Sequence, residues 1–285
     1  MCEPLCRSGI EAPQGGPRGL EVLVVGAGAM GRVLASYLSH RKSIRVSVYD
    51  IDRSKSMMLS REIGGRALEE LDDLEEYNIA LLCVPISSTP RMVDLLADKM
   101  KEGSTVVEIS SVKSPVIDVM RRAARIGLRP ISIHPLFGPG IKDLSKGKAA
   151  IVEVTDLEKE VGLASEIFPF ELIPVDVKEH DRAMAWLALT HLILNAFLSS
   201  SDGDAELLTS LSTTTLGHFI RLAAASLTQN EALTRELMEL NPYFPSILHT
   251  FVERLSKGDV SEIRAEIRRW LELIDLREAY SSLYE

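Results

Sequence analysis

The chain has 285 residues, of which 46% are hydrophobic, 26% charged and only 5% aromatic, so its core must be built from aliphatic side chains. The net charge of −9, without a dense lysine or arginine block, excludes nucleic acid and anionic membranes as expected partners. Three cysteines are too few for a disulfide framework, and Cys2 and Cys6 lack a second pair for zinc. We therefore expect a cytoplasmic protein without a metal site.

Two segments could be mistaken for targeting signals. Residues 1–19 are rich in glycine and proline but have no apolar run, so we predict a disordered leader and not a secretory signal. The uncharged stretch Ala183–Ser201 contains a histidine, an asparagine and three serines. We predict a buried helix there and no membrane span.

Strand-like and helix-like segments alternate between residues 20 and 176. The predicted strands are Glu21–Val25, Val46–Asp50, Ile79–Val84, Thr105–Ile109, Pro130–Ile133, Ala149–Val154 and Glu171–Val175. The predicted helices begin at Ala29, at Thr89-Pro90, at Ser114-Pro115 and at a capping box over Thr155–Glu158. Repeated strand–helix units predict an α/β domain with a doubly wound parallel sheet over residues 20–176.

Strand signals end near residue 176. From Val177 to the C-terminus, apolar residues recur at helical spacing. We therefore predict a second, all-helical domain over residues 177–285. These two domains account for the length, so we expect no additional catalytic or regulatory domain.

A G-x-G-x-x-G motif, Gly26–Gly31, follows the first strand and opens the first helix. Gly26 permits the tight turn, Gly28 allows the backbone to approach a pyrophosphate, and Gly31 allows the helix to pack on the strand. Ala29 and Met30 supply amides of the helix N-terminus. This arrangement predicts a Rossmann-type dinucleotide site, the alternative being a glycine turn needed only for packing.

Asp50 ends the second strand, nineteen residues past Gly31. An acid at this position hydrogen-bonds the ribose hydroxyls and repels a 2′-phosphate, so we predict NAD, with NADP left open by the nearby Arg53. Val84 and Pro85 end the third strand at the same crevice. They either form its wall or simply stop the strand.

Two polar loops follow neighbouring strands, and the carboxyl ends of strands border the ligand crevice. Glu108–Lys113 contains Ser111, and His134–Pro139 begins with a histidine between a strand and two prolines. We predict His134 as a general base oriented by Ser111. The alternative is that His134 only stabilises its loop.

These motifs resemble the prephenate dehydrogenase family of tyrosine biosynthesis. The resemblance rests on Gly26–Gly31, Ser111–Lys113, His134–Pro139, Glu179–Ala185 and Leu189–His191, and it covers about residues 20–285. It implies oxidative decarboxylation of prephenate or arogenate with NAD or NADP, and a homodimer formed through the helical domains. Lys113 is predicted to bind substrate. Because the chain is too short to include a chorismate mutase domain, a separate chorismate mutase is a candidate partner.

The helical region carries one isolated cation. Arg221 is the only formally charged residue between Leu207 and Asn230. Its position resembles that of the family's arginine for a substrate carboxylate, the alternative being an ion pair with an acid of another helix or subunit. His191 and Asn195 lie four residues apart on one helix face, where they either line the substrate pocket or form a buried polar pair. Asp181 lies early in the same helix. A role in the site and a favourable interaction with the positive end of the helix dipole explain it equally well.

Two rival functions remain. A β-hydroxyacid dehydrogenase would need a lysine where His191 stands, and a non-catalytic NAD-sensing regulator would not need Ser111, His134 and Arg221 together. The expected mechanism places prephenate between the domains. Its hydroxyl would bond to His134 and a carboxylate to Arg221, while hydride and CO2 leave the ring.

Overall fold

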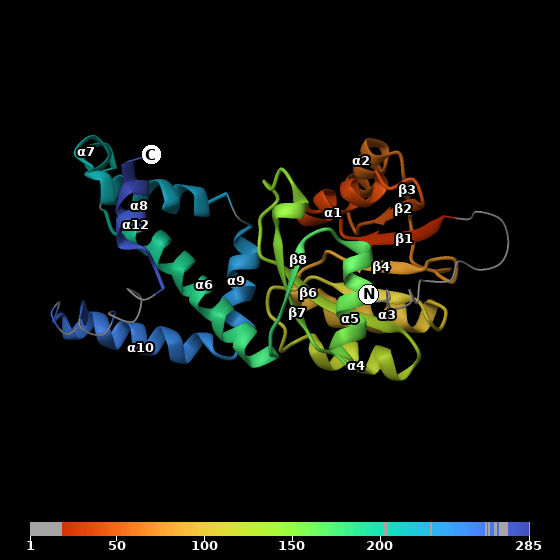
Figure 1. Cartoon of the computed structure of the whole chain (residues 1–285). Coiled ribbons are helices and arrows are strands. Elements are labelled where there is room, and N and C mark those ends of the chain that lie inside the picture. The colour runs from red at the N-terminus through yellow and green to blue at the C-terminus, as the bar shows by residue number, and fades with distance from the viewer. Residues whose placement is uncertain are drawn as a thin grey trace, which may run out of the picture.

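The structure is a computed structural model that describes residues 19–284, apart from 202–204, 229, 260, 262, 265–266 and 268–272. The predicted leader, with Cys2 and Cys6, therefore lies outside the described residues except for Gly19. Figure 1 shows an α/β part beside a group of helices that project away from it. The predicted combination of a Rossmann-type sheet with a C-terminal helical region is confirmed.

The sheet has eight strands in the order β3-β2-β1-β4-β5-β6-β7-β8. Their bounds are Leu20–Val25 (β1), Ile44–Tyr49 (β2), Arg66–Ala67 (β3), Ile79–Leu82 (β4), Thr105–Glu108 (β5), Arg129–Pro135 (β6), Lys148–Val152 (β7) and Glu171–Pro174 (β8). Every pair is parallel except β6–β7. The expectation of a wholly parallel sheet is thus wrong at this pair, because residues 136–147 turn back without an α-helix to carry the chain across.

Helices cover both faces of the sheet. α1 (Ala29–Ser39), α2 (Arg53–Ile63) and α5 (Leu157–Ile167) pack on one face through buried leucine, alanine and isoleucine side chains. α3 (Thr89–Lys99) and α4 (Ile117–Arg125) pack on the other. Both faces of the strands are therefore buried, which explains their continuous apolar runs.

Two helix starts differ from their predictions. The N-cap of α5 is Asp156, whose carboxylate accepts from the Lys159 amide at 3.2 Å, and Glu160 accepts from the Val154 and Thr155 amides. The capping box expected over Thr155–Glu158 is therefore wrong. α4 begins at Ile117 without a side-chain cap, because the Ser114 hydroxyl bonds to Asp181 instead.

The helices after the sheet are α6 (Val177–Ser199), α7 (Ala205–Ser210), α8 (Thr214–Ser226), α9 (Glu231–Glu239), α10 (Phe244–Lys257) and α12 (Leu276–Ser281). A third apolar cluster joins them to the sheet domain, since Ile86 and Val112 pack with Leu189 of α6 and Leu237 of α9. Two residues, 175 and 176, separate β8 from α6. The division into domains at residue 176 remains a prediction.

α6 is the one helix among the described residues that is long and apolar enough to cross a membrane, which by itself is weak evidence. It buries His180, Asp181 and His191 within the protein, as a packed helix does and a lipid-facing one does not. Only 28% of its apolar window is buried, and Trp186 is 54% exposed. The predicted buried helix is therefore buried on one face only.

Candidate active site

The turn between β1 and α1 depends on glycines. Gly26 has a φ of 103°, and a Cβ there would lie 2.2 Å from the Cys83 carbonyl oxygen. A Cβ on Gly31 would lie 1.9 Å from the Gly26 carbonyl oxygen, whereas one on Gly28 would meet no atom within 4 Å. Gly26 and Gly31 thus permit the turn, and Gly28 leaves open space above it for a phosphate.

The surroundings of this turn fit a dinucleotide. α1 has no side-chain cap and no acid in its first turn, so its amides and its positive end are available to an anion. The Asp50 carboxylate accepts from the Ala27 amide at 2.7 Å and from the Asp52 amide at 2.8 Å. Asp50 is thereby held against the turn with acceptor capacity left for hydroxyl groups.

A cavity of about 540 Å³ extends from the turn across the ends of β4 and β5. Seven of the eight residues predicted to bind the cofactor line it: Gly26, Gly28, Ala29, Met30, Asp50, Val84 and Pro85. Gly31 packs beneath the turn instead. Ser110 and Ser111 line the same cavity, so the loops after three neighbouring strands meet in one hollow.

One wall of this cavity comes from α9, which sequence reasoning missed. Asn230, Leu233 and Glu236 line it. The Glu236 carboxylate accepts a hydrogen bond from the Ile86 amide at 2.8 Å and others from the amide and hydroxyl of Ser87. Figure 1 shows α9 between α6 and the sheet. No motif marks this segment, and its role depends on a contact across 150 residues of chain.

His134 lies on β6 beside the loop that follows β5, because Glu108 pairs in register with Ser132. The side chain is 7% exposed, and its Nδ1 lies 3.1 Å from His180 Nε2. Its Nε2 has no hydrogen-bond partner among the residues that the structure describes. The expectation that Ser111 orients His134 is wrong in this structure, since the bonded neighbour is His180.

Three features lower the pKa of His134 well below 6.5: its burial, the neighbouring His180 and the Lys113 ammonium. The ring is therefore neutral at pH 7, with one nitrogen free to accept a proton or a hydrogen bond. A neutral histidine at the end of a central strand is the arrangement that a general base requires.

Lys113 does not lie where a substrate ligand would. Its side chain is fully buried, and its Nζ lies 2.7 Å from Glu108 Oε1 and 2.6 Å from the Ile133 carbonyl oxygen. Glu108 also accepts from the Ser132 hydroxyl and the Ser110 amide. The structure thus contradicts a substrate contact by Lys113, because its ammonium is held in a buried ion pair with Glu108 that fixes the loop after β5 against β6.

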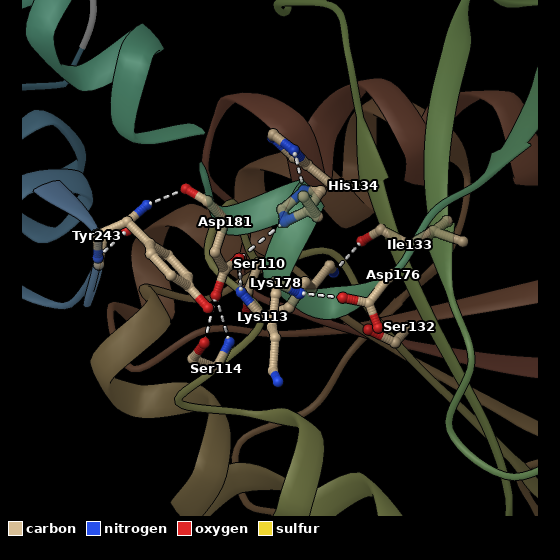
Figure 2. A network of polar contacts seen from close by, with 12 residues as sticks. Ser110, Lys113, Ser114, Ser132, Ile133, His134, Asp176, Lys178, Asp181 and Tyr243 are labelled. Atoms are coloured by element: carbon tan, nitrogen blue, oxygen red, sulfur yellow. Dashed lines mark hydrogen bonds and ion pairs between the residues drawn. The ribbon is translucent and has the colours of Figure 1, made fainter. Parts of the chain in front are cut away.

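Asp181 holds the same loop from the other side. Its carboxylate accepts from the Lys113 amide at 2.7 Å, from the Ser114 amide at 2.8 Å and from His180 Nδ1 at 2.8 Å (Figure 2). Burial acts to raise the pKa of Asp181, but these hydrogen bonds outweigh it and lower the pKa. Asp176 caps α6, so a helix-dipole role does not explain Asp181.

Comparison with known proteins shows which proteins the chain is similar to. The family model described as prephenate dehydrogenase, nucleotide-binding domain, matches residues 34–159. A Methanocaldococcus jannaschii protein named "Probable arogenate/prephenate dehydrogenase" is 24% identical over 252 residues, which cover 85% of this chain. Residues 34–159 therefore match the nucleotide-binding domain of prephenate dehydrogenases, and most of the chain is similar to the archaeal protein.

Two further proteins are similar to this chain, one in sequence and one in fold. A Streptomyces pristinaespiralis 4-amino-4-deoxyprephenate dehydrogenase is 28% identical over 183 residues, or 62% of this chain. The chain spans 56% of the length of the archaeal relative and 61% of this one. The A. aeolicus prephenate dehydrogenase, solved with hydroxyphenyl propionate and NAD+, has the same fold, with a TM-score of 0.70 and 18% identity over 92% of this chain and 96% of that one.

His191 and Asn195, predicted to line the substrate pocket or to form a buried polar pair, share a face of α6, but their side chains do not bond to each other. His191 is 5% exposed, its Nδ1 has no partner among the described residues, and burial lowers its pKa. The Asn195 amide donates to the His191 carbonyl oxygen at 2.7 Å. Neither residue lines the cavity at the glycine turn, so a pocket role remains a prediction.

Arg221 lies on the exposed surface of α8. Its guanidinium is 3.2 Å from His218 Nδ1, and it forms no ion pair within the described ranges of the chain. In this single chain Arg221 is therefore exposed and is not part of an ion pair with another described helix. Its charge is available to a ligand or to another chain.

Metal ligands and the Cys83 thiol are the remaining candidates for chemistry. Within residues 19–284, apart from the gaps named above, no group of three His, Cys, Asp or Glu side chains could hold a metal ion. Cys83 follows β4, and burial raises the pKa of its thiol to about 12. The Cys83 thiol is therefore neutral and unreactive at pH 7.

Proposed function

We propose that the chain catalyses the NAD-dependent oxidative decarboxylation of prephenate to 4-hydroxyphenylpyruvate in tyrosine biosynthesis. The observation that carries this proposal is His134, a buried neutral histidine on β6, next to the strand whose following residues Ser110 and Ser111 line the cavity at the dinucleotide turn. Arogenate is the second candidate substrate, because the archaeal relative is named for both compounds. The choice between them depends on whether the pocket meets a keto or an amino group.

The chemistry asks little of the protein beyond positioning and one proton acceptor. A bound nicotinamide dinucleotide supplies the hydride acceptor. His134 Nε2 accepts a hydrogen bond from the hydroxyl on C4 of prephenate, which stabilises the positive charge that develops as hydride leaves C4. The ring carboxylate then departs as CO2, its bonding electrons complete the aromatic ring, and His134 returns the hydroxyl proton that it accepted to the phenol oxygen.

Further residues complete the proposed pocket. Arg221 holds a substrate carboxylate, and a guanidinium suits a bidentate contact of this kind. His191 and Asn195 line the substrate side, and Ser111 contributes its hydroxyl at the nicotinamide end. Lys113 acts through the loop that it anchors.

We further propose a cytoplasmic homodimer formed through the helical region, with a separate chorismate mutase as a partner. The support for the dimer is a set of exposed apolar side chains on α6, α8 and α10: Trp186, Leu187, Phe197, Leu222, Val252 and Leu255. Apolar side chains in this number favour burial against another protein surface.

The test is NADH formation, followed by absorbance, on mixing the chain with NAD and prephenate, arogenate or a β-hydroxyacid. We expect turnover with prephenate, and a higher kcat/KM for arogenate would reassign the substrate. Turnover of the β-hydroxyacid alone would support the rival dehydrogenase. The absence of product from all three would refute the enzymatic proposal and leave the NAD-sensing regulator.

Asp50 is expected to select NAD over NADP. In the Asp50→Asn variant the repulsion of a 2′-phosphate is gone, and the NAD/NADP ratio of kcat/KM should fall by on the order of tenfold. Asp52→Asn is the matched control, because Asp52 is a neighbouring acid that does not line the cavity. An equal change of the ratio in both variants would mean that Asp50 acts only as one of several negative charges near the site, and not by local repulsion of the 2′-phosphate.

Arg221→Gln is expected to raise KM for prephenate roughly 10- to 100-fold, the effect of losing hydrogen bonds to a charged group. KM for NAD should stay constant. Arg235→Gln is the control, because Arg235 is an exposed arginine of α9 paired with Glu231. An unchanged KM for prephenate in Arg221→Gln would favour an ion pair with another subunit.

A further inference from the structure

A chain of buried hydrogen bonds runs from β6 into α6. His134 Nδ1 lies 3.1 Å from His180 Nε2, and His180 Nδ1 lies 2.8 Å from Asp181 Oδ1. The three side chains are at most 7% exposed, and the two rings meet edge to face, with an interplanar angle of 82°. Figure 2 shows His134 and Asp181 at the two ends of this chain.

The hydrogen bonds of the Asp181 carboxylate determine which ring nitrogens of His180 and His134 carry a proton. The carboxylate accepts from four donors, namely the amides of Lys113 and Ser114, the Ser114 hydroxyl and His180. An ionised carboxylate only accepts, so His180 Nδ1 carries a proton. In neutral His180, Nε2 is then an acceptor, and His134 Nδ1 must donate to it. The one lone pair left on neutral His134 is on Nε2.

We propose that His180 and Asp181 are positioning residues that fix the tautomer and ring orientation of His134. This inference rests on the proposed function for its catalytic meaning, since Nε2 is the nitrogen that must accept from the substrate hydroxyl. When His134 gains positive charge, the Asp181 carboxylate supplies the counter-charge through His180. Without the two residues, neutral His134 is free to protonate Nε2 and lose its acceptor.

The surrounding contacts hold the hydrogen-bonded side chains of His134, His180 and Asp181 in place. The buried Asn241 amide donates to the Asp181 carbonyl oxygen at 2.7 Å, which ties the start of α10 to the same point of α6. The other charged groups next to His134 are Lys113 and its partner Glu108, which belong to the loop after β5. Neither forms a hydrogen bond with the His134 ring, so neither selects its tautomer.

A purely structural interpretation assigns Asp181 only to holding the Lys113 and Ser114 amides. His180→Phe separates the two interpretations, because it removes the ring nitrogens but leaves the Asp181 contacts with these amides. If Asp181 only holds these amides, His180→Phe should leave both the tautomer of His134 and kcat unchanged. If His180 positions His134, the Nδ1 proton of His134 loses its acceptor, and the ring is no longer held in one tautomer.

The experiment is 15N NMR of the full chain labelled at histidine, without substrate, with the His134 signals assigned by their loss in His134→Asn. We expect wild-type His134 to carry its proton on Nδ1, and the His180→Phe spectrum to show Nε2 protonation. We also expect kcat of His180→Phe to fall about 10- to 100-fold, the range for partners of a functional histidine, with KM for NAD unchanged. His249→Phe on the exposed side of α10 is the matched control.

Two results would overturn the proposal. One is wild-type His134 protonated on Nε2, and the other is an unchanged tautomer and kcat in His180→Phe. The NMR result does not depend on the substrate, so a failure of the proposed function would appear separately, as the expected tautomer without turnover of prephenate or arogenate. Asp181→Asn gives an independent arm, because an amide that donates to His180 Nδ1 would reverse the protons on both rings.

Discussion

Replacing His134 with asparagine is expected to lower kcat by about 10²- to 10⁴-fold, the usual contribution of a positioned general base. Asparagine is small enough for the site and removes the imidazole, while the glycine turn and Asp50 remain intact. NAD affinity, measured by titration, should therefore stay the same. His249→Asn is the control, because His249 is an exposed histidine of α10. Unchanged turnover in His134→Asn would rule out a catalytic role for His134.

The same residue sets an expectation for pH. The native pKa of His134 lies well below 6.5 because of burial, His180 and Lys113. The neutral form therefore persists as the pH falls through 6.5, and the acid limb of kcat/KM should begin below that pH. The pKa of His134 is higher in the unfolded state, so the unfolded state takes up the proton first as the pH falls. The free energy of unfolding should therefore decline below about pH 6.5, whereas a histidine with a raised native pKa would have the opposite effect.

The sequence predicts the sheet well because its strands are buried on both faces. Such strands are continuous runs of valine, isoleucine and leucine that local inspection detects. α2 was not predicted, since its buried positions are Ser56, Leu59 and Ser60 and so give little apolar periodicity. The reversal at β7 was also missed, because strand direction depends on how residues 136–147 return and not on the strand itself.

The site divides in the same way. The cofactor turn is contiguous in sequence, and its glycines have steric reasons that can be recognised in advance. The partners of His134 are not local: His180 is 46 residues away, and Asp181 bonds to an amide 68 residues away. The position of Ser111 after the neighbouring strand predicts it as the orienting residue, but nothing in the spacing identifies which side chain reaches the ring.

Lys113→Met is expected to lower the free energy of unfolding by about 3–5 kcal/mol, the cost of leaving a buried charge without its partner. The variant keeps a side chain of similar length but removes the ammonium from Glu108, whose carboxylate is fully buried. The Ser110 amide and the Ser132 hydroxyl still donate to Glu108, but neither neutralises it. Urea denaturation followed by circular dichroism measures the loss.

A double variant separates the buried charge from the lost packing. Glu108→Gln combined with Lys113→Met removes both charges, so it should recover most of the stability lost in Lys113→Met alone. Lys148→Met is the surface control, since Lys148 pairs with Glu171 in solvent and its loss should leave unfolding nearly unchanged. If Lys113→Met behaved like Lys148→Met, the ion pair would not be what holds the loop after β5 beside His134. The loop would then depend on the hydrogen bonds that its amides donate to Asp181 and Glu108.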